Sequence, residues 1–165
     1  MLISFGGVDQ SNGTGLALEA LKRERFHESI VVIGEQHPMR GAIAAACHTE
    51  GYECHVQSTR IAEIIDSCDV ALGASGASAW ERCFLGLPTL MISVADNQAE
   101  IAREVAGRGA GLNLGSWPDA SADAIAAAIA EIRSRPELVE EMSSSAYAIM
   151  EGHVDVADLL IGRSA

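Results

Sequence analysis

The sequence predicts an α/β protein: a Rossmann-like domain whose parallel sheet of about six strands is covered by helices on both faces. Short apolar runs alternate with helix-length segments along the chain of 165 residues. Hydrophobic residues make up 48% of the chain and aromatic residues only 4%, with 16 glycines, which suits close packing of helices on a sheet. Because strands and helices alternate, each strand is expected to lie parallel to its neighbours.

The first 72 residues contain four predicted strands and the helices between them. The strands are short apolar or β-branched runs that end at glycine or polar residues, and the first helix has three candidate capping residues before it: Asp9, Ser11 and Asn12. The predicted strands are 2–5, 29–33, 52–56 and 69–72. The predicted helices are 16–21, 39–50 and 59–67.

The second half continues the alternation from a turn of small residues, 73–78. A helical segment follows, and Gly86-Leu87-Pro88 ends it before the next apolar run. Ser121 is a typical N-cap residue, and Pro136 is typical of a helix start. The predicted strands are 89–94 and 111–114, and the predicted helices are 97–107, 122–134, 136 to about 146 or 150, and 154–161. Without repeats or linkers, residues 1–165 are predicted to form a single domain.

Composition excludes several classes of function. The formal net charge of −12 disfavours nucleic-acid binding, which needs clustered Lys and Arg. The apolar runs are well short of the roughly 20 residues of a membrane span, and the N-terminus does not resemble a signal peptide. The cysteines show no metal-ligand spacing. We therefore expect a cytoplasmic protein without a metal, a cofactor, a nucleic-acid partner or a membrane span. Its four thiols are expected to be reduced and buried: Cys47, Cys54, Cys68 and Cys83.

Three polar loops follow predicted strands, at 4–9, 73–78 and 95–98. Since the carboxyl ends of parallel strands share one edge of the sheet, these loops are expected to lie together there, where such folds bind ligands. Any one of them is more simply explained as a tight turn of glycine, Asp or Asn. Three together favour a ligand site, although the sequence contains neither a Walker-type loop nor a dinucleotide fingerprint.

Single residues near the 73–78 turn allow two interpretations. Glu81 is suited to accept hydrogen bonds from ribose hydroxyls, but it is equally suited to a first helical turn, where a carboxylate is stabilised. Trp80 is expected to pack in the core, and Arg82 to be solvated or ion-paired. The histidines fall on separate predicted elements, and none has an obvious Ser, Cys or carboxylate partner: His27, His37, His48, His55 and His153.

Three segments resemble a known family. The segment 4–9 (SFGGVD) is similar to the start of the C-terminal half of the UDP-sugar hydrolase of pseudaminic acid biosynthesis. The segment 73–88 (GASGASAWERCFLGLP) is similar to a long motif of the same half, and 95–98 (ADNQ) to a third. That family shares the two-domain glycosyltransferase-B architecture with the lipid II N-acetylglucosaminyltransferase and spore-coat polysaccharide proteins. The resemblance implies that this chain is a UDP-binding half.

The resemblance also assigns residues to UDP. Gly6 and Gly7 would lie against the diphosphate. Ile61 stands at the centre of a loop, 59–62, that would hold uracil through backbone groups. Glu81 would accept hydrogen bonds from the ribose hydroxyls.

The remaining assignments concern the phosphates and the sugar. Gly76, Ala77 and Ser78 would donate hydrogen bonds to phosphate. Asn97 and Gln98 would face the diphosphate or the sugar. The chain departs from the family where Ala77 and Ala79 replace hydroxyl residues and where 151–154 (EGHV) stands for a D-G-x-G stretch.

The family's N-terminal domain carries a G-x-G-H motif with a histidine that activates water, and this sequence has no such motif. The resemblance therefore implies the donor-binding half of an enzyme that hydrolyses a UDP-2,4-diacetamido-2,4,6-trideoxy-hexose, or of a related glycosyltransferase. Its expected partners are the UDP-sugar and either a separate N-terminal-domain subunit or a second copy. The alternative is a non-catalytic module that binds a nucleotide sugar or another protein.

Overall fold

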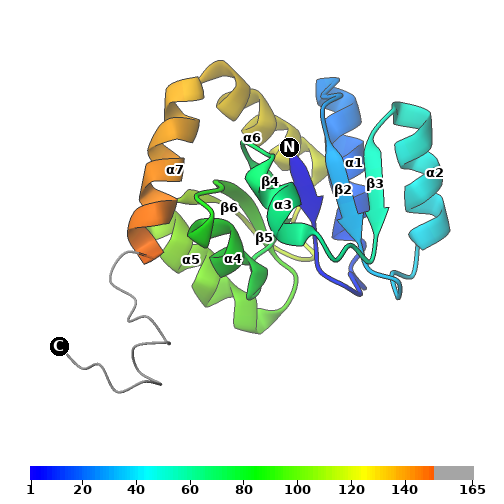
Figure 1. Cartoon of the computed structure of the whole chain (residues 1–165), viewed down its shortest axis with the longest axis horizontal. Coiled ribbons are helices and arrows are strands. Elements are labelled where there is room, and N and C mark those ends of the chain that lie inside the picture. Colours follow the sequence, from blue (N-terminus) through cyan, green and yellow to red (C-terminus); the bar gives the residue numbers. More distant parts are fainter. Residues whose placement is uncertain (151–165) are drawn as a thin grey trace.

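The computed structural model describes residues 1–150 and confirms the predicted fold class (Figure 1). Six strands form one sheet in the order β3-β2-β1-β4-β5-β6, and every neighbouring pair is parallel. The strands are β1 (Leu2–Ser4), β2 (Ile30–Ile33), β3 (Glu53–Val56), β4 (Ala71–Ala74), β5 (Thr89–Ser93) and β6 (Gly111–Ser116).

The helices lie in the predicted segments, with shifted ends. The first helix begins three residues before the predicted segment 16–21, and the predicted helix 59–67 is shorter than expected. The predicted helix 154–161 and the segment 151–154 lie outside the described residues. The helices are α1 (Gly13–Glu24), α2 (Arg40–Glu50), α3 (Ile61–Asp66), α4 (Ser78–Phe84), the 3-10 turn η1 (Asp96–Gln98), α5 (Ala99–Gly107), α6 (Ala122–Ser134) and α7 (Pro136–Met150).

Both faces of the sheet are buried, which explains the apolar runs of the strands. Successive strand residues point to opposite faces, so Ile3 packs with α1, α2 and α6, whereas Leu2 packs with α3. In β5, Leu90 joins the first of these clusters and Met91 the cluster formed with α4, α5 and α7. None of the helices within residues 1–150 is long and apolar enough to cross a membrane.

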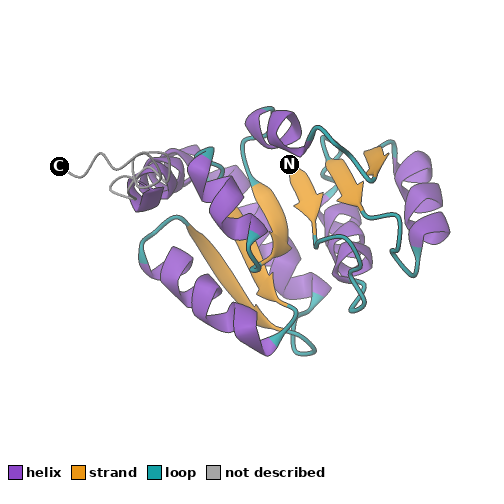
Figure 2. Cartoon of the chain, turned by 60° about the horizontal axis from the view of Figure 1, so that its bottom comes forward, coloured by secondary structure: helices purple, strands orange, loops and turns teal. Residues whose placement is uncertain are grey.

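The strand order places a topological switch point between β1 and β4. From β1 the chain runs outward through β2 to β3, then returns to form β4 on the other side of β1. The loops that leave β1 and β4 therefore diverge at the carboxyl edge of the sheet, where folds of this kind have a crevice. Figure 2 shows this edge at the arrowheads of the strands. The predicted loops 4–9 and 73–78 lie at this edge, and 95–98 follows the adjacent strand β5.

Helix capping agrees with the sequence in part. The Ser121 hydroxyl accepts a hydrogen bond from the backbone N–H of Ala124 over 3.2 Å, as predicted. At the start of α1, Asp9 is the residue that caps: its carboxylate accepts from the N–H groups of Gly13 and Thr14 at 2.8 and 2.9 Å. Asn12 makes no side-chain cap there.

The cysteine prediction is confirmed for two residues. Cys47 and Cys83 are free and buried, whereas Cys54 and Cys68 are free and half-buried. Among the described residues no group of three His, Cys, Asp or Glu side chains could hold a metal ion.

Candidate functional site

A cavity of about 210 Å³ opens at the carboxyl ends of β1, β2 and β3. Three of the predicted site residues line it: Gly6, Gly7 and Ile61. Its other walls come from the ends of the strands and the loop after β3: Ser4, Val32, Ile33, Gly34, Gln57 and Ser58. The structure thus brings the first predicted loop and the predicted uracil loop to one cavity.

Gly34 and Gly7 approach each other through their backbones. A Cβ atom on Gly34 would lie 1.8 Å from the carbonyl oxygen of Gly7, far inside van der Waals contact. Only glycine at position 34 therefore lets the first loop lie across the end of β2. Sequence reasoning treated Gly34 only as the end of a strand, although a glycine directly after a buried strand is a signal of close backbone approach.

A buried hydrogen bond between His37 and Asp9 also holds the loop 4–9 in place. Nε2 of His37 lies 3.1 Å from Oδ2 of Asp9, and both side chains are fully buried. Because Nδ1 of His37 accepts a hydrogen bond from the N–H of Met39 over 3.0 Å, Nε2 carries the proton and donates to the carboxylate. The sequence showed no obvious carboxylate partner for any histidine. His37 has one because the loops after β1 and β2 come together, and a second such pair joins His55 to Glu53 on β3 over 2.6 Å.

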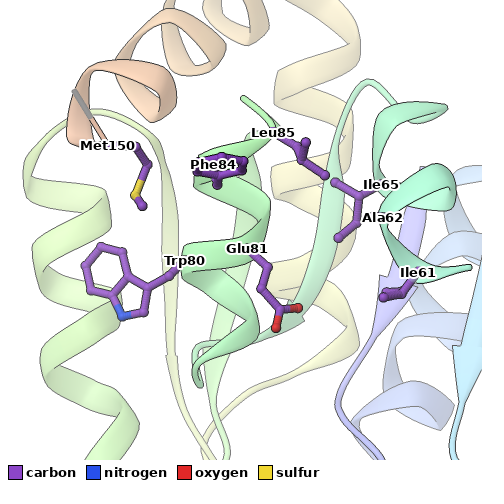
Figure 3. Close-up of a pocket in the computed structure, with 8 residues that line it drawn as sticks. All are labelled: Ile61, Ala62, Ile65, Trp80, Glu81, Phe84, Leu85 and Met150. Atoms are coloured by element: carbon purple, nitrogen blue, oxygen red, sulfur yellow. The ribbon is translucent and has the colours of Figure 1, made fainter. Parts of the chain in front are cut away.

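A second, larger groove of about 470 Å³ runs between α3 and α4 (Figure 3). Figure 3 shows the Glu81 carboxylate pointing into it from α4, with Ile61 across the groove at the start of α3. Trp80, the preceding residue, lines the same groove on the side of Met150. Its ring is half-buried against the cluster around α5, so the predicted core packing of Trp80 is confirmed in part. Ile61 lines both cavities and is the point where they meet.

The 73–78 turn presents backbone donors. Within residues 1–150, the N–H groups of Gly76, Ala77 and Ser78 donate no hydrogen bond to the protein. Ser75 holds the turn in place, because its N–H donates to the carbonyl of Ile92 over 3.2 Å and its hydroxyl lies 2.9 Å from that of Ser93. Consecutive unpaired N–H groups on a fixed turn can bind an anion.

The third loop lies beside this turn. A Cβ on Gly76 would be 3.3 Å from Nε2 of Gln98, so the two predicted residues are neighbours. The Gln98 side chain is fixed because its Oε1 accepts a hydrogen bond from the N–H of Val94 over 3.1 Å. Asn97, in contrast, is exposed within η1.

Arg82 corrects the expectation of a solvated or ion-paired side chain. Only 1% of its surface is exposed, and its guanidinium donates to three neutral oxygens. Burial lowers the pKa of Arg82 to about 10. Sequence reasoning missed this residue because arginine is rarely buried, and its position one residue after exposed Glu81 gave no sign of the opposite orientation.

The fold matches that of the C-terminal, Rossmann-like domains of glycosyltransferases of the GT-B class. No family model matches the chain. The chain is similar to the spore coat polysaccharide biosynthesis protein SpsG of Bacillus subtilis (strain 168), with 26% identity over 119 residues. These residues are 70% of this chain and 35% of SpsG, so the match spans about a third of that relative.

Solved structures show the same fold. HepE of Anabaena in complex with UDP has a TM-score of 0.72 and 16% identity, over 98% of this chain and 47% of HepE. A Streptomyces glycosyltransferase complexed with thymidine diphosphate has a TM-score of 0.69 and 22% identity, over 99% of this chain and 40% of the glycosyltransferase. The C-terminal CMP-Kdo binding domain of WaaA from Acinetobacter baumannii has a TM-score of 0.66 and 13% identity, over 92% of this chain and 89% of the WaaA domain.

Proposed function

We propose that this chain binds the UDP moiety of a nucleotide sugar at the carboxyl edge of its sheet. One observation carries the proposal: two cavities meet at Ile61, one floored by Gly6 and Gly7 and the other containing the carboxylate of Glu81. The two cavities offer the distinct surfaces that a nucleoside diphosphate needs, namely close backbone for phosphates and a carboxylate acceptor for hydroxyls.

In this proposal uracil binds at the loop before α3, around Ile61, and Glu81 accepts hydrogen bonds from the ribose hydroxyls. The phosphates lie between Gly6-Gly7 and the unpaired N–H groups of the 73–78 turn. Gln98 lies next to Gly76 and would contact the diphosphate or the sugar. Asn97, exposed in the same loop, would face the sugar.

The enzyme class is a finer part of the proposal. The motifs at 4–9, 73–88 and 95–98 support the donor-binding half of a UDP-sugar hydrolase that acts on a UDP-2,4-diacetamido-2,4,6-trideoxy-hexose, and the similarity to SpsG supports a related enzyme of polysaccharide synthesis. We propose that an N-terminal domain, on a separate chain or within a longer protein, contributes the group that activates water or the acceptor. The described chain alone is expected to bind UDP with little turnover.

Isothermal titration with UDP, 2′-deoxy-UDP and UMP tests the proposal. Wild-type protein is expected to bind UDP more tightly than 2′-deoxy-UDP, and Glu81→Gln is expected to lose about tenfold in UDP affinity, as for a hydrogen bond to a charged group. Glu141→Gln is the matched control, because it removes the same charge from an exposed position on α7. The proposal is wrong if wild-type protein shows neither heat of binding nor a higher melting temperature at millimolar UDP.

A further inference from the structure

The guanidinium of Arg82 is a buried cation held by neutral groups. Nη2 donates to the carbonyl of Ala74 over 2.7 Å, Nη1 to the hydroxyl of Ser78 over 3.2 Å, and Nε to the hydroxyl of Thr89 over 3.1 Å. In the part of the chain that the structure describes, no carboxylate forms an ion pair with it.

A charge buried in this way is costly to the folded state unless another charge compensates it. Burial lowers the pKa of Arg82 to about 10, yet this value still leaves the side chain positive at neutral pH. Hydrogen bonds to neutral oxygens satisfy the N–H groups but leave the net charge in place. Among residues 1–150 no carboxylate lies within ion-pair distance of this charge; the Glu81 carboxylate acts on it only from further away and raises its pKa less than burial lowers it.

The location of this charge indicates where the counter-charge comes from. Its partners Ala74 and Ser78 flank the turn whose inner residues are Ser75 to Ala77. Beneath the turn, Nη1 lies 3.4 Å from the position of a Cβ on Gly73. Above it, Ala77 is exposed, and the unpaired N–H groups of residues 76–78 lie in the same turn. An anion bound to those N–H groups would lie on the same turn whose flanking residues, Ala74 and Ser78, accept hydrogen bonds from the guanidinium.

We propose that Arg82 determines the specificity of the site for phosphorylated ligands: its buried charge, beneath the 73–78 turn, favours a nucleoside diphosphate over the neutral nucleoside. This inference rests on the proposed function and deepens it. Arg82 does not touch the ligand; it acts through the turn, by position and by charge. At an effective dielectric constant of about 20, an attraction between unit charges over about 10 Å or less changes affinity by about tenfold or more.

The test compares UDP with uridine, because the two share base and ribose and differ in charge. Wild-type protein, Arg82→Gln and Arg82→Lys are titrated with both. Arg82→Gln is expected to lower the UDP-to-uridine affinity ratio at least tenfold, while uridine affinity stays within about threefold. Arg82→Lys keeps the charge and is expected to keep the ratio within about threefold. If Arg82 had a purely structural role, Arg82→Gln would weaken the binding of UDP and of uridine equally, and that result would overturn the inference.

A second pair of variants leaves Arg82 in place. Thr89→Asp supplies a carboxylate beside Nε and so gives the cation a counter-charge within the protein, whereas Thr89→Asn is the neutral control of the same size. The UDP-to-uridine ratio is expected to fall about tenfold in Thr89→Asp relative to Thr89→Asn. Equal ratios in the two variants overturn the inference even if the Arg82 variants do not fold. If wild-type protein binds uridine and UDP equally, this inference fails together with the proposed phosphate contacts, whereas the proposed nucleoside contacts at Ile61 and Glu81 stand; if it binds neither ligand, the whole proposed function fails.

Discussion

His37 and Asp9 form a buried hydrogen bond of 3.1 Å between residues 28 positions apart, on the loops that follow β2 and β1. Asp9 also accepts the first backbone N–H groups of α1, so a single carboxylate connects the histidine, the helix start and the glycine loop of the candidate site. These hydrogen bonds hold the end of the Gly6-Gly7 loop in place.

Replacing His37 by alanine removes one partner and leaves the buried carboxylate under-satisfied. We expect His37→Ala to lower the free energy of unfolding by about 1–3 kcal/mol, measured by urea denaturation. His48→Ala on the exposed side of α2 is the control and should change stability by less than about 0.5 kcal/mol. Equal urea midpoints for the two variants would show that the His37–Asp9 bond contributes nothing.

Because the backbone of Gly34 lies against that of Gly7, we expect alanine substitutions at Gly34 and at Gly41 to have opposite effects on stability. Gly34→Ala is expected to lose at least about 2 kcal/mol of stability and to weaken UDP binding, because the added Cβ displaces the first loop. Gly41→Ala, in α2, meets no atom within 4 Å and is expected to gain about 0.5–1 kcal/mol. Thermal melts with and without UDP measure both effects. A Gly34→Ala protein as stable as the wild type would contradict the close approach.

The cap at Ser121 predicts a local effect on α6. Ser121→Ala leaves the N–H of Ala124 without its partner, and we expect a loss of about 1 kcal/mol in the free energy of unfolding. Ser121→Asp retains an acceptor and should remain within about 0.5 kcal/mol of the wild type. Chemical denaturation followed by circular dichroism is the measurement, and an unchanged midpoint for the alanine variant would rule out the cap.

Cys47 predicts a loss of stability in alkaline solution. Burial, reinforced by the neighbouring Cys54 thiol, raises the pKa of Cys47 from an ordinary value of 9.0 to about 12. Between pH 9 and pH 12 the unfolded chain loses the thiol proton that the folded chain keeps. The contribution of the protonated thiol to the free energy of unfolding is therefore fully present below pH 9 and falls as the pH rises toward 12. We expect the wild type to lose up to about 1.4 kcal/mol more per pH unit than Cys47→Ala in this window.

Urea midpoints of the two proteins at pH 8 and pH 10 measure that difference in slope. Alkylation with iodoacetamide at pH 8 gives an independent check, because Cys47 and Cys83 should react only after unfolding, whereas the half-buried Cys54 is more accessible. Rapid native labelling of Cys47, or parallel pH dependences, would contradict its burial as a protonated thiol.

Much of the architecture follows from local pattern. Apolar runs such as 30–33 and 89–93 are long enough only for strands, and helices of 6 to 12 residues separate the strands. This alternation forces a parallel sheet and brings the loops 4–9, 73–78 and 95–98 to one edge, because all parallel strands end there. The position of the candidate site could therefore be predicted without knowing one long-range contact.

The alternation of apolar runs and helix-length segments was sufficient to predict the fold class, and it placed three polar loops at the carboxyl edge, where we propose that a ligand binds. Which residues contact those loops from within the protein became visible only in the folded chain: His37 with Asp9, Gly34 against Gly7, and Arg82 with the 73–78 turn. The physical reason is that patterning along the chain sets local periodicity, whereas a charge such as Arg82 is buried only when elements distant in sequence surround it with hydrogen-bond acceptors.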